Sequence, residues 1–559
     1  MPATVAISIK RRVVEILQRA LDRARSTGDL RGDPVPVSVE APKRGAWGDF
    51  ATTIALTLGS AERRPPRQVA EIIKQYIEPA DVLEAVDVAG PGYVNVTVRR
   101  EAWRSVIQEV LAAGTSYARG EPTGRSVQVE FVSANPTGPL HVGHGRLAAV
   151  GLGLANLLAA AGNTVQREYY INDAGRQMRL LGESVWARYC TLVGRATPMP
   201  DDGYQGAYVE EIARVVAADA GPRYLAMPRD EAIAALTAQA YQRLLAEIRA
   251  DLDAFGVTFD SWVSERALFA AGAVEQVVER LKSLGYVYEA DGAVWFQSSL
   301  LGDEKDRVIR KQDGEWTYLA SDLAYHLQKL TAGHDVLVDL WGADHHGYVA
   351  RIRALLRALG YPDDRLRVEI GQLVSVVRKG KPVAMSKRAG TFVMLRDVID
   401  EVGRDAALLT FQMRRLDSPM EFDLELVKEQ SAENPVYYIQ YAHARAASVL
   451  RTAAEQALSW QTVGEADLAH LELSEEFGLL KALAAYPDVI VDAAAAYEPH
   501  RLAYFLQDLA SQFHAYYYKH RIIGEDRVLS VARLALAAAT GVVIRNGLAI
   551  LGVSAPERM

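Results

Sequence analysis

Two histidines three residues apart are the side chains best placed to act on a phosphate. His141 and His144 stand in the string His-Val-Gly-His, after an alternating apolar run that predicts a strand and a bend rich in proline and glycine. An apolar run over 147–161 then predicts a helix. A strand-to-helix turn aims backbone N–H groups and the positive end of the helix dipole at an anion. Both imidazoles lie on one side of the first turn, where they can donate to phosphate oxygens, and Gly143 leaves room for a flat ring such as a purine.

A basic loop carries the next reactive group. Lys387 lies in VRKGKPVAMSKRAGTF, where flanking glycines would let its ammonium swing onto a triphosphate and neutralise charge as pyrophosphate leaves. Taken alone, such a loop is commonly a solvated basic hairpin, and an HxGH quartet alone often caps a helix. The rest of the chain therefore has to supply the context.

The elements around these groups alternate between strand and helix from about residue 120. This alternation predicts an α/β fold with a doubly wound parallel catalytic sheet of the Rossmann type. A ligand then lies outside the carboxyl ends of the strands, where both His141 and the segment 341–347 fall. Long helical patterns over 208–218 and 231–255 predict a connective insertion at about 197–290 within a catalytic domain of 120–400. The strands expected in the sheet are 128–132, 165–170, 336–341 and 368–373.

Two further units flank the predicted catalytic domain. Residues 1–113 predict an N-terminal α+β domain that carries no evident catalytic group. Residues 401–433 predict a linker, and 434–559 an all-α helical bundle. Within the first unit the patterns predict a helix around 13–21, a strand over 35–39, helices over 50–58 and 69–77, and a hairpin over 86–98.

Composition limits the class of protein. The chain has 559 residues, of which 50% are hydrophobic, and a formal net charge of −8. The single cysteine, Cys190, excludes a disulfide framework and a cysteine-based zinc cluster within the chain, so we expect no zinc and a cytoplasmic location. No secretory signal is evident, and the uncharged run 147–165 predicts a buried helix rather than a membrane span. The net negative charge leaves nucleic-acid binding open, because basic residues can be confined to one face.

The histidine string resembles the HIGH motif of class I aminoacyl-tRNA synthetases. Together with Glu130, Asn135 and the longer string His-Val-Gly-His-Gly-Arg, it resembles the bacterial-type arginyl-tRNA synthetases, as does most of the chain from Trp47 onward. Met385-Ser386-Lys387-Arg388 resembles the KMSKS loop of the same class, although Ala384 replaces the first lysine and Arg388 the last serine. Some arginyl-tRNA synthetases lack this loop and carry a lysine just before the HIGH motif. Here glycine and proline stand in that place, in agreement with the retained loop.

This resemblance implies an arginine–tRNA ligase. Such an enzyme activates arginine with ATP, which brings Mg²⁺, releases pyrophosphate and AMP, and transfers arginine to the 2′-OH of the terminal adenosine of tRNA(Arg). It also implies that activation needs tRNA and that the protein holds no metal of its own. Carried over by motif, the catalytic residues are His141, His144 and Lys387, and the ATP-binding residues are Gly143, Gly342, Asp344, Met385 and Ser386.

An arginine pocket needs carboxylates, because a guanidinium presents a planar fork of donors and stays charged. Tyr318 and Asp322 lie four residues apart, on one face of a predicted helix. The resemblance implies that Asp322 pairs with the guanidinium, that Glu130 and Asn135 contact the substrate nearer its amino end, and that His346 adds a contact. Periodicity alone does not choose arginine over lysine or glutamine.

The flanking units imply tRNA as the partner. By resemblance, the N-terminal domain meets the tRNA elbow, although a packing appendage is the alternative. The bundle resembles the DALR anticodon-binding domain, and its tyrosines near Arg445 and Lys519 suit unstacked bases, although many must be core. We expect a monomer without a membrane attachment.

Two alternatives stay open, a class I synthetase for another amino acid and a catalytically dead synthetase-like RNA-binding protein. The missing zinc ligands disfavour cysteine as the substrate, and the intact His141, His144 and Lys387 argue against a dead fold.

Overall fold

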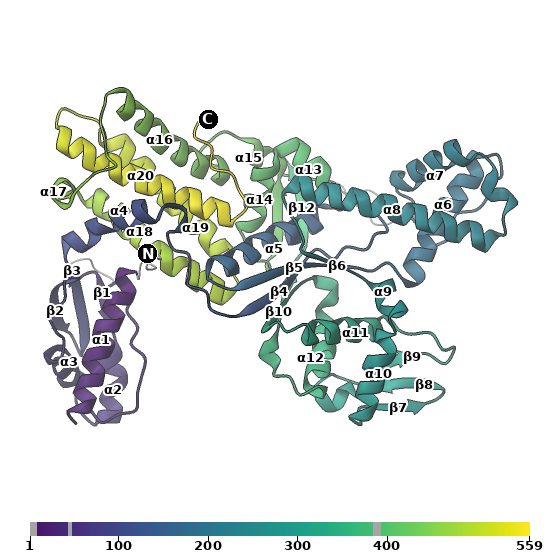
Figure 1. Ribbon diagram of the computed structural model, residues 1–559, viewed down its shortest axis with the longest axis horizontal. Coiled ribbons are helices and arrows are strands. Elements are labelled where there is room, and N and C mark those ends of the chain that lie inside the picture. Colours follow the sequence, from purple (N-terminus) through teal and green to yellow (C-terminus); the bar gives the residue numbers. More distant parts are fainter. Residues whose placement is uncertain (1–7, 43–46, 384–392) are drawn as a thin grey trace.

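The computed structural model describes residues 8–42, 47–383 and 393–559 (Figure 1). A small N-terminal unit hangs below a helical bundle at one end of the molecule, a parallel sheet lies at the centre, and a helical arm and a mixed subdomain extend from its other end. One hydrophobic core runs from the N-terminal unit through the sheet into the bundle, whereas the arm and the mixed subdomain have cores of their own.

The central sheet has five parallel strands in the order β11-β10-β4-β5-β6. The chain enters at β4 in the middle, moves outward to β5 and β6, and returns to the other side for β10 and β11, so β4 and β10 meet at the switch point where doubly wound sheets bind ligands. The predicted fold class is confirmed. The strands are β4 (Ser126–Glu130), β5 (Thr164–Ile171), β6 (Ser261–Ser264), β10 (Val336–Gly342) and β11 (Leu366–Gly371).

Two of these strands differ from the sequence expectation. β6 was not predicted, and it lies inside the range 197–290 given to the insertion, because the four residues Ser-Trp-Val-Ser are too short to show a pattern. β4 ends two residues earlier than the expected 128–132, since Val132 adopts a left-handed φ of 69° that no strand residue has.

Helix α5 (Val142–Ala160) connects β4 to β5 and is nearly all apolar because it is buried against the sheet. Its glycines allow close packing: a Cβ on Gly151 would lie 2.3 Å from the Phe131 ring. By length and composition α5 and α20 (Arg527–Ile550) could cross a membrane, but 72% and 67% of these stretches are buried inside the protein. Core packing therefore accounts for the apolarity of both helices.

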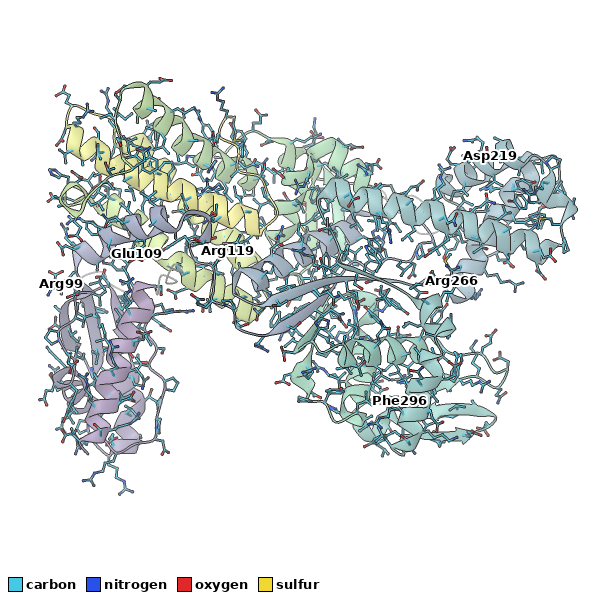
Figure 2. All side chains as sticks on the ribbon, in the orientation of Figure 1. Arg99, Glu109, Arg119, Asp219, Arg266 and Phe296 are labelled. Carbon is cyan, nitrogen blue, oxygen red and sulfur yellow. The ribbon has the colours of Figure 1, made fainter. Side chains whose placement is uncertain are left out.

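The predicted insertion is mostly a helical arm. Helices α7 (Ala207–Ala220) and α8 (Arg229–Phe255) agree with the two long helical patterns. The arm also contains α6 (Gly175–Leu192), which ends before the expected start of the insertion at about residue 197. Figure 2 shows Arg266 where the arm meets the sheet. Its guanidinium lies 3.7 Å from the Asp173 carboxylate and 5.3 Å from the centre of the Tyr241 ring of α8, which ties the arm to the carboxyl end of β5.

The mixed subdomain follows β6 and contains the three-stranded sheet β7-β8-β9, with Phe296 in its core (Figure 2). Its helix α11 packs back toward the ends of β4 and β10, which brings Tyr318 and Asp322 to the switch point. The elements are α9 (Glu265–Ala270), α10 (Ala273–Ser283), β7 (Val287–Ala290), β8 (Ala293–Phe296), β9 (Arg307–Arg310), α11 (Tyr318–Thr331) and α12 (Val349–Ala358).

A second small sheet, β13-β12-β14, joins the catalytic domain to the bundle. The chain starts it directly after β11, so the expected strand 368–373 is in fact the end of β11 and the turn into β12. The elements are β12 (Val374–Arg378), β13 (Lys381–Pro382), α13 (Leu395–Val402), α14 (Arg404–Gln412), β14 (Met420–Asp423) and α15 (Leu424–Lys428).

The N-terminal unit is an antiparallel sheet, β1-β3-β2, covered by helices. The predicted hairpin is confirmed, but the predicted strand over 35–39 is wrong: Pro34 and Pro36 lack the N–H groups that a ladder needs. The predicted helix over 50–58 starts as a strand instead. The elements are α1 (Ile9–Ser26), β1 (Phe50–Thr52), α2 (Ile54–Glu62), α3 (Pro66–Gln75), β2 (Leu83–Ala89) and β3 (Tyr93–Val98).

The C-terminal bundle is all helical, as predicted, and it also holds α4 (Arg100–Ala113), which the sequence analysis placed in the N-terminal unit. α4 packs against α18 and α20, and the Arg104 guanidinium donates to the Leu471 carbonyl oxygen. The other helices are α16 (Pro435–Glu455), α17 (Glu465–Leu468), α18 (Ser474–Ala496), α19 (His500–Lys519) and α20.

Candidate active site

The histidine turn is built as the N-terminal cap of α5. The Gly143 N–H donates to His141 Nδ1 at 3.1 Å, the His141 N–H donates to His144 Nδ1 at 3.3 Å, and the two rings stack with centroids 3.7 Å apart. Because both Nδ1 atoms accept, each neutral ring carries its proton on Nε2, which makes that atom the donor. A Cβ on residue 143 would lie 3.0 Å from the His141 ring, so the glycine also makes room for this stack.

A backbone clasp ties this turn to the chain that follows residue 392. The Val142 N–H donates to the Val393 carbonyl oxygen at 3.0 Å, and the Leu395 N–H donates to the Leu140 carbonyl oxygen at 2.9 Å, so His141 pairs with Met394. Met385, Ser386 and Lys387 lie outside the described residues. Their approach to the histidines stays a prediction, although the nearest described residue after them is hydrogen-bonded to the histidine turn.

A cavity of about 310 Å³ opens at the carboxyl ends of β4 and β10. Four separate segments of the chain line it, and it brings together most of the predicted substrate residues. His346 does not line the cavity: it is exposed on the short 3-10 helix Ala343–Tyr348, where its neighbour His345 lines the wall instead. The predicted residues in the wall are Glu130, Asn135, Tyr318, Asp322, Gly342 and Asp344.

Asp322 is the unpaired charge of this cavity. Its carboxylate accepts no hydrogen bond from the described part of the chain. Burial raises its pKa to about 7, Glu265 and Glu130 act in the same direction, and the positive charges of His326 and Arg351 oppose them. Asp322 is partly buried in the cavity wall, and a carboxylate withdrawn from water without a donor is costly, so this site favours a bound cation.

Glu130, by contrast, is already paired. It is buried at the end of β4, and its Oε2 accepts from Lys329 Nζ at 2.7 Å while Oε1 accepts from the Ser133 hydroxyl at 2.9 Å. Lys329 also donates to Asp339 Oδ1 at 2.5 Å. Lys329 and Asp339 were not predicted, although the sequence holds one signal for them: a lone aspartate in the apolar strand Val-Leu-Val-Asp-Leu needs a buried partner.

The wall between β4 and the cavity is strained. Val132 and Ser133 have φ of 69° and 39°, a left-handed conformation that is rare for a β-branched residue. The turn carries Asn135 to the cavity, where its Nδ2 donates to Gln177 Oε1 at 2.7 Å. Backbone strain of this kind persists only where the surrounding structure holds the residue in place, and it is frequent at binding sites.

The bundle presents aromatic rings beside a cation on α16 and α19. Tyr437 and Tyr441 stack with centroids 5.6 Å apart, and the Arg445 guanidinium lies 4.4 Å above the Tyr441 ring and 5.3 Å from that of Tyr517. Tyr516 is buried and therefore core, whereas the others are partly exposed. Such a partly exposed surface suits unstacked bases.

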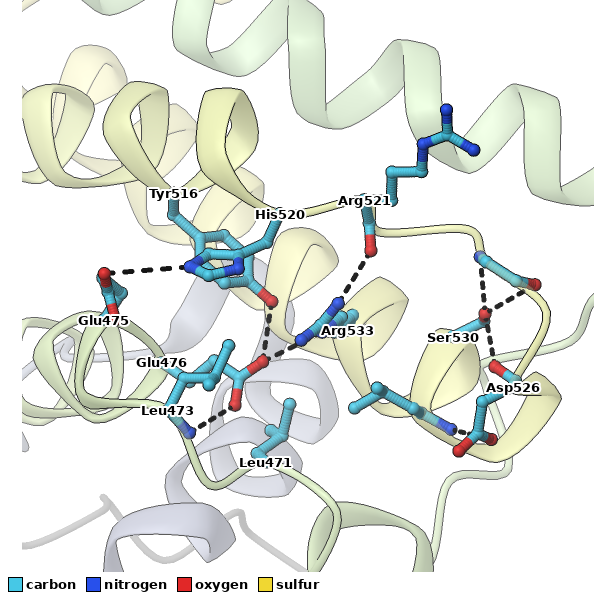
Figure 3. A network of polar contacts seen from close by, with 12 residues as sticks. Leu471, Leu473, Glu475, Glu476, Tyr516, His520, Arg521, Asp526, Ser530 and Arg533 are labelled. Atoms are coloured by element: carbon cyan, nitrogen blue, oxygen red, sulfur yellow. Dashed lines mark hydrogen bonds and ion pairs between the residues drawn. The ribbon is translucent and has the colours of Figure 1, made fainter.

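A buried carboxylate holds the end of α19 in place (Figure 3). Glu476 accepts hydrogen bonds from the Leu473 N–H at 3.0 Å, from the Tyr516 hydroxyl at 3.0 Å and from Arg533 Nε at 2.9 Å. Arg533 also donates to the Arg521 carbonyl oxygen at 2.8 Å, so one network joins α18, α19, α20 and the loop between the last two.

Comparisons with known proteins agree with this architecture part by part. The family model described as arginyl tRNA synthetase N terminal domain matches residues 9–98, that for tRNA synthetases class I (R), catalytic domain, matches 106–418, and that for the DALR anticodon binding domain matches 439–559.

Known proteins are also similar to this chain over its full length. The arginine–tRNA ligases of Syntrophotalea carbinolica and Citrifermentans bemidjiense are 46% and 44% identical, each over 99% of this chain and 100% of the relative. The solved Thermus thermophilus arginyl-tRNA synthetase shares the fold, with a TM-score of 0.77 at 22% identity over 98% of this chain and 100% of that one. The chain therefore belongs to the arginyl-tRNA synthetases, the class I ligases that join arginine to tRNA.

Proposed function

We propose that the cavity at the ends of β4 and β10 binds the substrate arginine, with Asp322 pairing the guanidinium. The unpaired Asp322 carboxylate is the observation that carries this assignment, because a planar guanidinium supplies the donors that the wall lacks. Tyr318 lies one helical turn before it on α11. Asn135 and Glu130, at the β4 side, face the amino end of the substrate, and His346 adds an outer contact.

ATP lies over the histidine turn in this proposal. His141 and His144 donate from Nε2 to the triphosphate, and the amino end of α5 adds its dipole. Adenine stacks over Gly143, and the ribose meets Gly342 and Asp344. Met385, Ser386 and Lys387 close on the nucleotide from the other side.

Mg²⁺ enters with the nucleotide as part of the substrate. No cluster of three or more metal-ligating side chains occurs among the described residues, and Mg²⁺ readily binds triphosphate oxygens and water instead.

The reaction then needs positioning and charge stabilisation more than covalent chemistry. The arginine carboxylate attacks the α-phosphate in line, and pyrophosphate leaves as Lys387 and the histidines neutralise its charge. The 2′-OH of the terminal adenosine of tRNA(Arg) next attacks the arginyl carbonyl and releases AMP. The bundle face around Tyr441 and Arg445 receives the anticodon loop, and the N-terminal unit receives the tRNA elbow.

We also propose a cytoplasmic monomer. A buried, unpaired thiol at Cys190 is compatible with a reducing compartment. Sedimentation of the purified protein tests the monomeric state, and a dimer at low micromolar concentration contradicts it.

Charging assays test the arginine assignment. Purified tRNA is offered each labelled amino acid in turn, and only arginine should be attached. L-citrulline, which has the shape of arginine without its charge, should compete at least about 100-fold less well, since an unpaired buried carboxylate costs several kcal/mol. Charging with another amino acid favours a different synthetase, and no charging at all favours a dead fold.

A further inference from the structure

His326 lines the wall of the cavity and lies close to two carboxylates, those of Asp322 and Asp339. The ring is 3% exposed and belongs to α11, one turn after Asp322. Its Nδ1 lies 2.8 Å from the Asp322 backbone carbonyl oxygen, and its Nε2 lies 3.0 Å from Asp339 Oδ2. Nothing in the proposed reaction uses this histidine.

Both ring nitrogens of His326 face atoms that only accept. A carbonyl oxygen has no proton to give, and Asp339 is ionised: although burial acts to raise the Asp339 pKa, Lys329 and His326 hold it below its ordinary value. Both nitrogens therefore donate, which requires the doubly protonated, positively charged ring.

The charges then alternate along one buried row. Hydrogen bonds join His326, Asp339, Lys329 and Glu130, whose charges are plus, minus, plus and minus. The Asp322 carboxylate extends the row at the other end through its charge interaction with His326. Burial acts to lower the Lys329 pKa, but its two carboxylate partners raise it above the ordinary value, so the lysine stays charged. Asp322, His326 and Lys329 share one face of α11 at helical spacing, which lets a single helix carry the row.

We propose that His326 is a positioning residue for arginine recognition, whose buried positive charge links the carboxylate that pairs the guanidinium to the one that faces the amino end. The proposal rests on the assignment of Asp322 to the guanidinium. His326 is not the group that pairs with the guanidinium; its charge opposes the rise in the Asp322 pKa, and its ring holds the helix turn that carries Asp322. The charge row thereby makes one buried network responsible for both ends of the ligand.

The pH dependence of arginine binding reports this charge. With a pKa of about 7, Asp322 in the empty site is protonated below pH 7, so the arginine KM should rise about tenfold per unit below that pH and stay level above it. The charged or titratable groups that face Asp322 are His326, Glu265, Glu130, Arg351, Tyr170 and Tyr348. Those that face His326 are Asp339, Asp322 and the neighbouring Tyr325 ring.

His326→Gln tests the proposal in aminoacylation assays from pH 6 to pH 8.5. The variant removes the charge and keeps a donor amide, so the pH at which the arginine KM levels off should move up by about one unit, because a nearby cation lowers an acid's pKa by roughly that much or more. At pH 7 the arginine KM should rise about 5-fold to 10-fold, while the KM values for ATP and tRNA stay within about twofold. His334→Gln, on the loop after α11, is the matched control. It should not move the pH at which the arginine KM levels off, which we call the break.

The outcomes separate this inference from the arginine assignment. A break that stays at the wild-type pH in His326→Gln overturns the positioning role. No break in the wild type, together with full arginine use by Asp322→Asn, overturns the assignment itself. Should the glutamine variant not fold, nitrogen NMR of the wild type labelled with ¹⁵N-histidine decides: a His326 ring that carries protons on both nitrogens supports the proposal, and a ring with one bare nitrogen overturns it.

Discussion

Two carboxylates in this synthetase, the buried Glu476 and the partly buried Asp322, have opposite surroundings. Glu476 in the C-terminal bundle accepts from a backbone N–H, a tyrosine hydroxyl and an arginine, and its side chain is fully buried. Asp322 in the catalytic cavity accepts nothing from the described chain, and burial raises its pKa to about 7. The bundle pairs its acid within the fold, whereas the described chain gives no hydrogen bond to the acid of the cavity, which we propose to pair with the substrate.

The comparison teaches how to tell a charged group that stabilises the fold from one that binds a ligand. Burial of a charge is costly in both places. Where the chain itself supplies the partners, the charge fixes how helices pack. Where it does not, the chain carries a cost that a bound cation would relieve, as we propose for Asp322.

The largest effect should come from Asp322→Asn. We expect the arginine kcat/KM to fall about 1000-fold, since removing one partner of a buried charged pair costs several kcal/mol. Stability should not fall. The folded pKa is raised above the ordinary 3.8, so the stability due to this group is full below that value and lost as pH rises through about 7. At pH 8 the asparagine variant should therefore melt at the same or a higher temperature.

Charging kinetics and thermal melts measure this variant. Asp508→Asn, at an exposed aspartate on α19, is the control and should change neither quantity. Retained arginine use together with a lower melting temperature would reverse the comparison.

Glu476→Ala should show the converse pattern. It strands the mostly buried Arg533 charge, which should lower the local stability of the bundle by about 3 kcal/mol and leave the arginine KM unchanged. Hydrogen exchange of α18, α19 and α20 measures the change, since a chain with several domains has no single unfolding free energy. Unaltered protection of these helices would count against a structural role.

A smaller effect is expected from Tyr441→Ala on the bundle surface. The ring stacks on Tyr437 and carries Arg445 at 4.4 Å, so its loss should raise the tRNA KM about tenfold through lost base stacking and leave the arginine KM unchanged. Charging at varied tRNA and at varied arginine separates the two constants. A change in the arginine KM alone would show that the two regions are not independent.

The smallest effect should come from Glu475→Ala, one residue before Glu476. Its carboxylate pairs with Lys519 at 3.3 Å on the surface, where solvent screens the charge. Neither hydrogen exchange nor charging should change measurably. Because the two glutamates are sequence neighbours, comparing their alanine variants shows whether burial of Glu476 causes the loss of helix stability.

Sequence patterns predicted the elements whose period is long and clear. The helices α7 and α8, the hairpin β2–β3 and the four longer sheet strands follow from alternation and helical spacing. β6 was missed because four residues carry no period, and the strand at 35–39 was wrong because its prolines outweigh its valines.

In the candidate site, the sequence predicted the residues that face the cavity but not the buried residues that hold them. Asp322 and Tyr318 share a helix face, and their spacing shows this directly. The row behind them joins α11 to β4 and β10, and only the folded chain brings Lys329 to both Glu130 and Asp339. Long-range pairing of this kind leaves no periodic trace, apart from the lone aspartate in an apolar strand.

The backbone clasp between Val142 and Val393 restricts where the chain can change length. Because side chains alternate along a paired segment, adding one residue between 393 and 395 would shift the pairing and turn Met394 away from His141. We therefore expect insertions and deletions between the two segments in places such as the arm, whose hydrophobic core is separate from the main one. The histidine turn and the start of α13 behave as one part, despite the long stretch of chain between them.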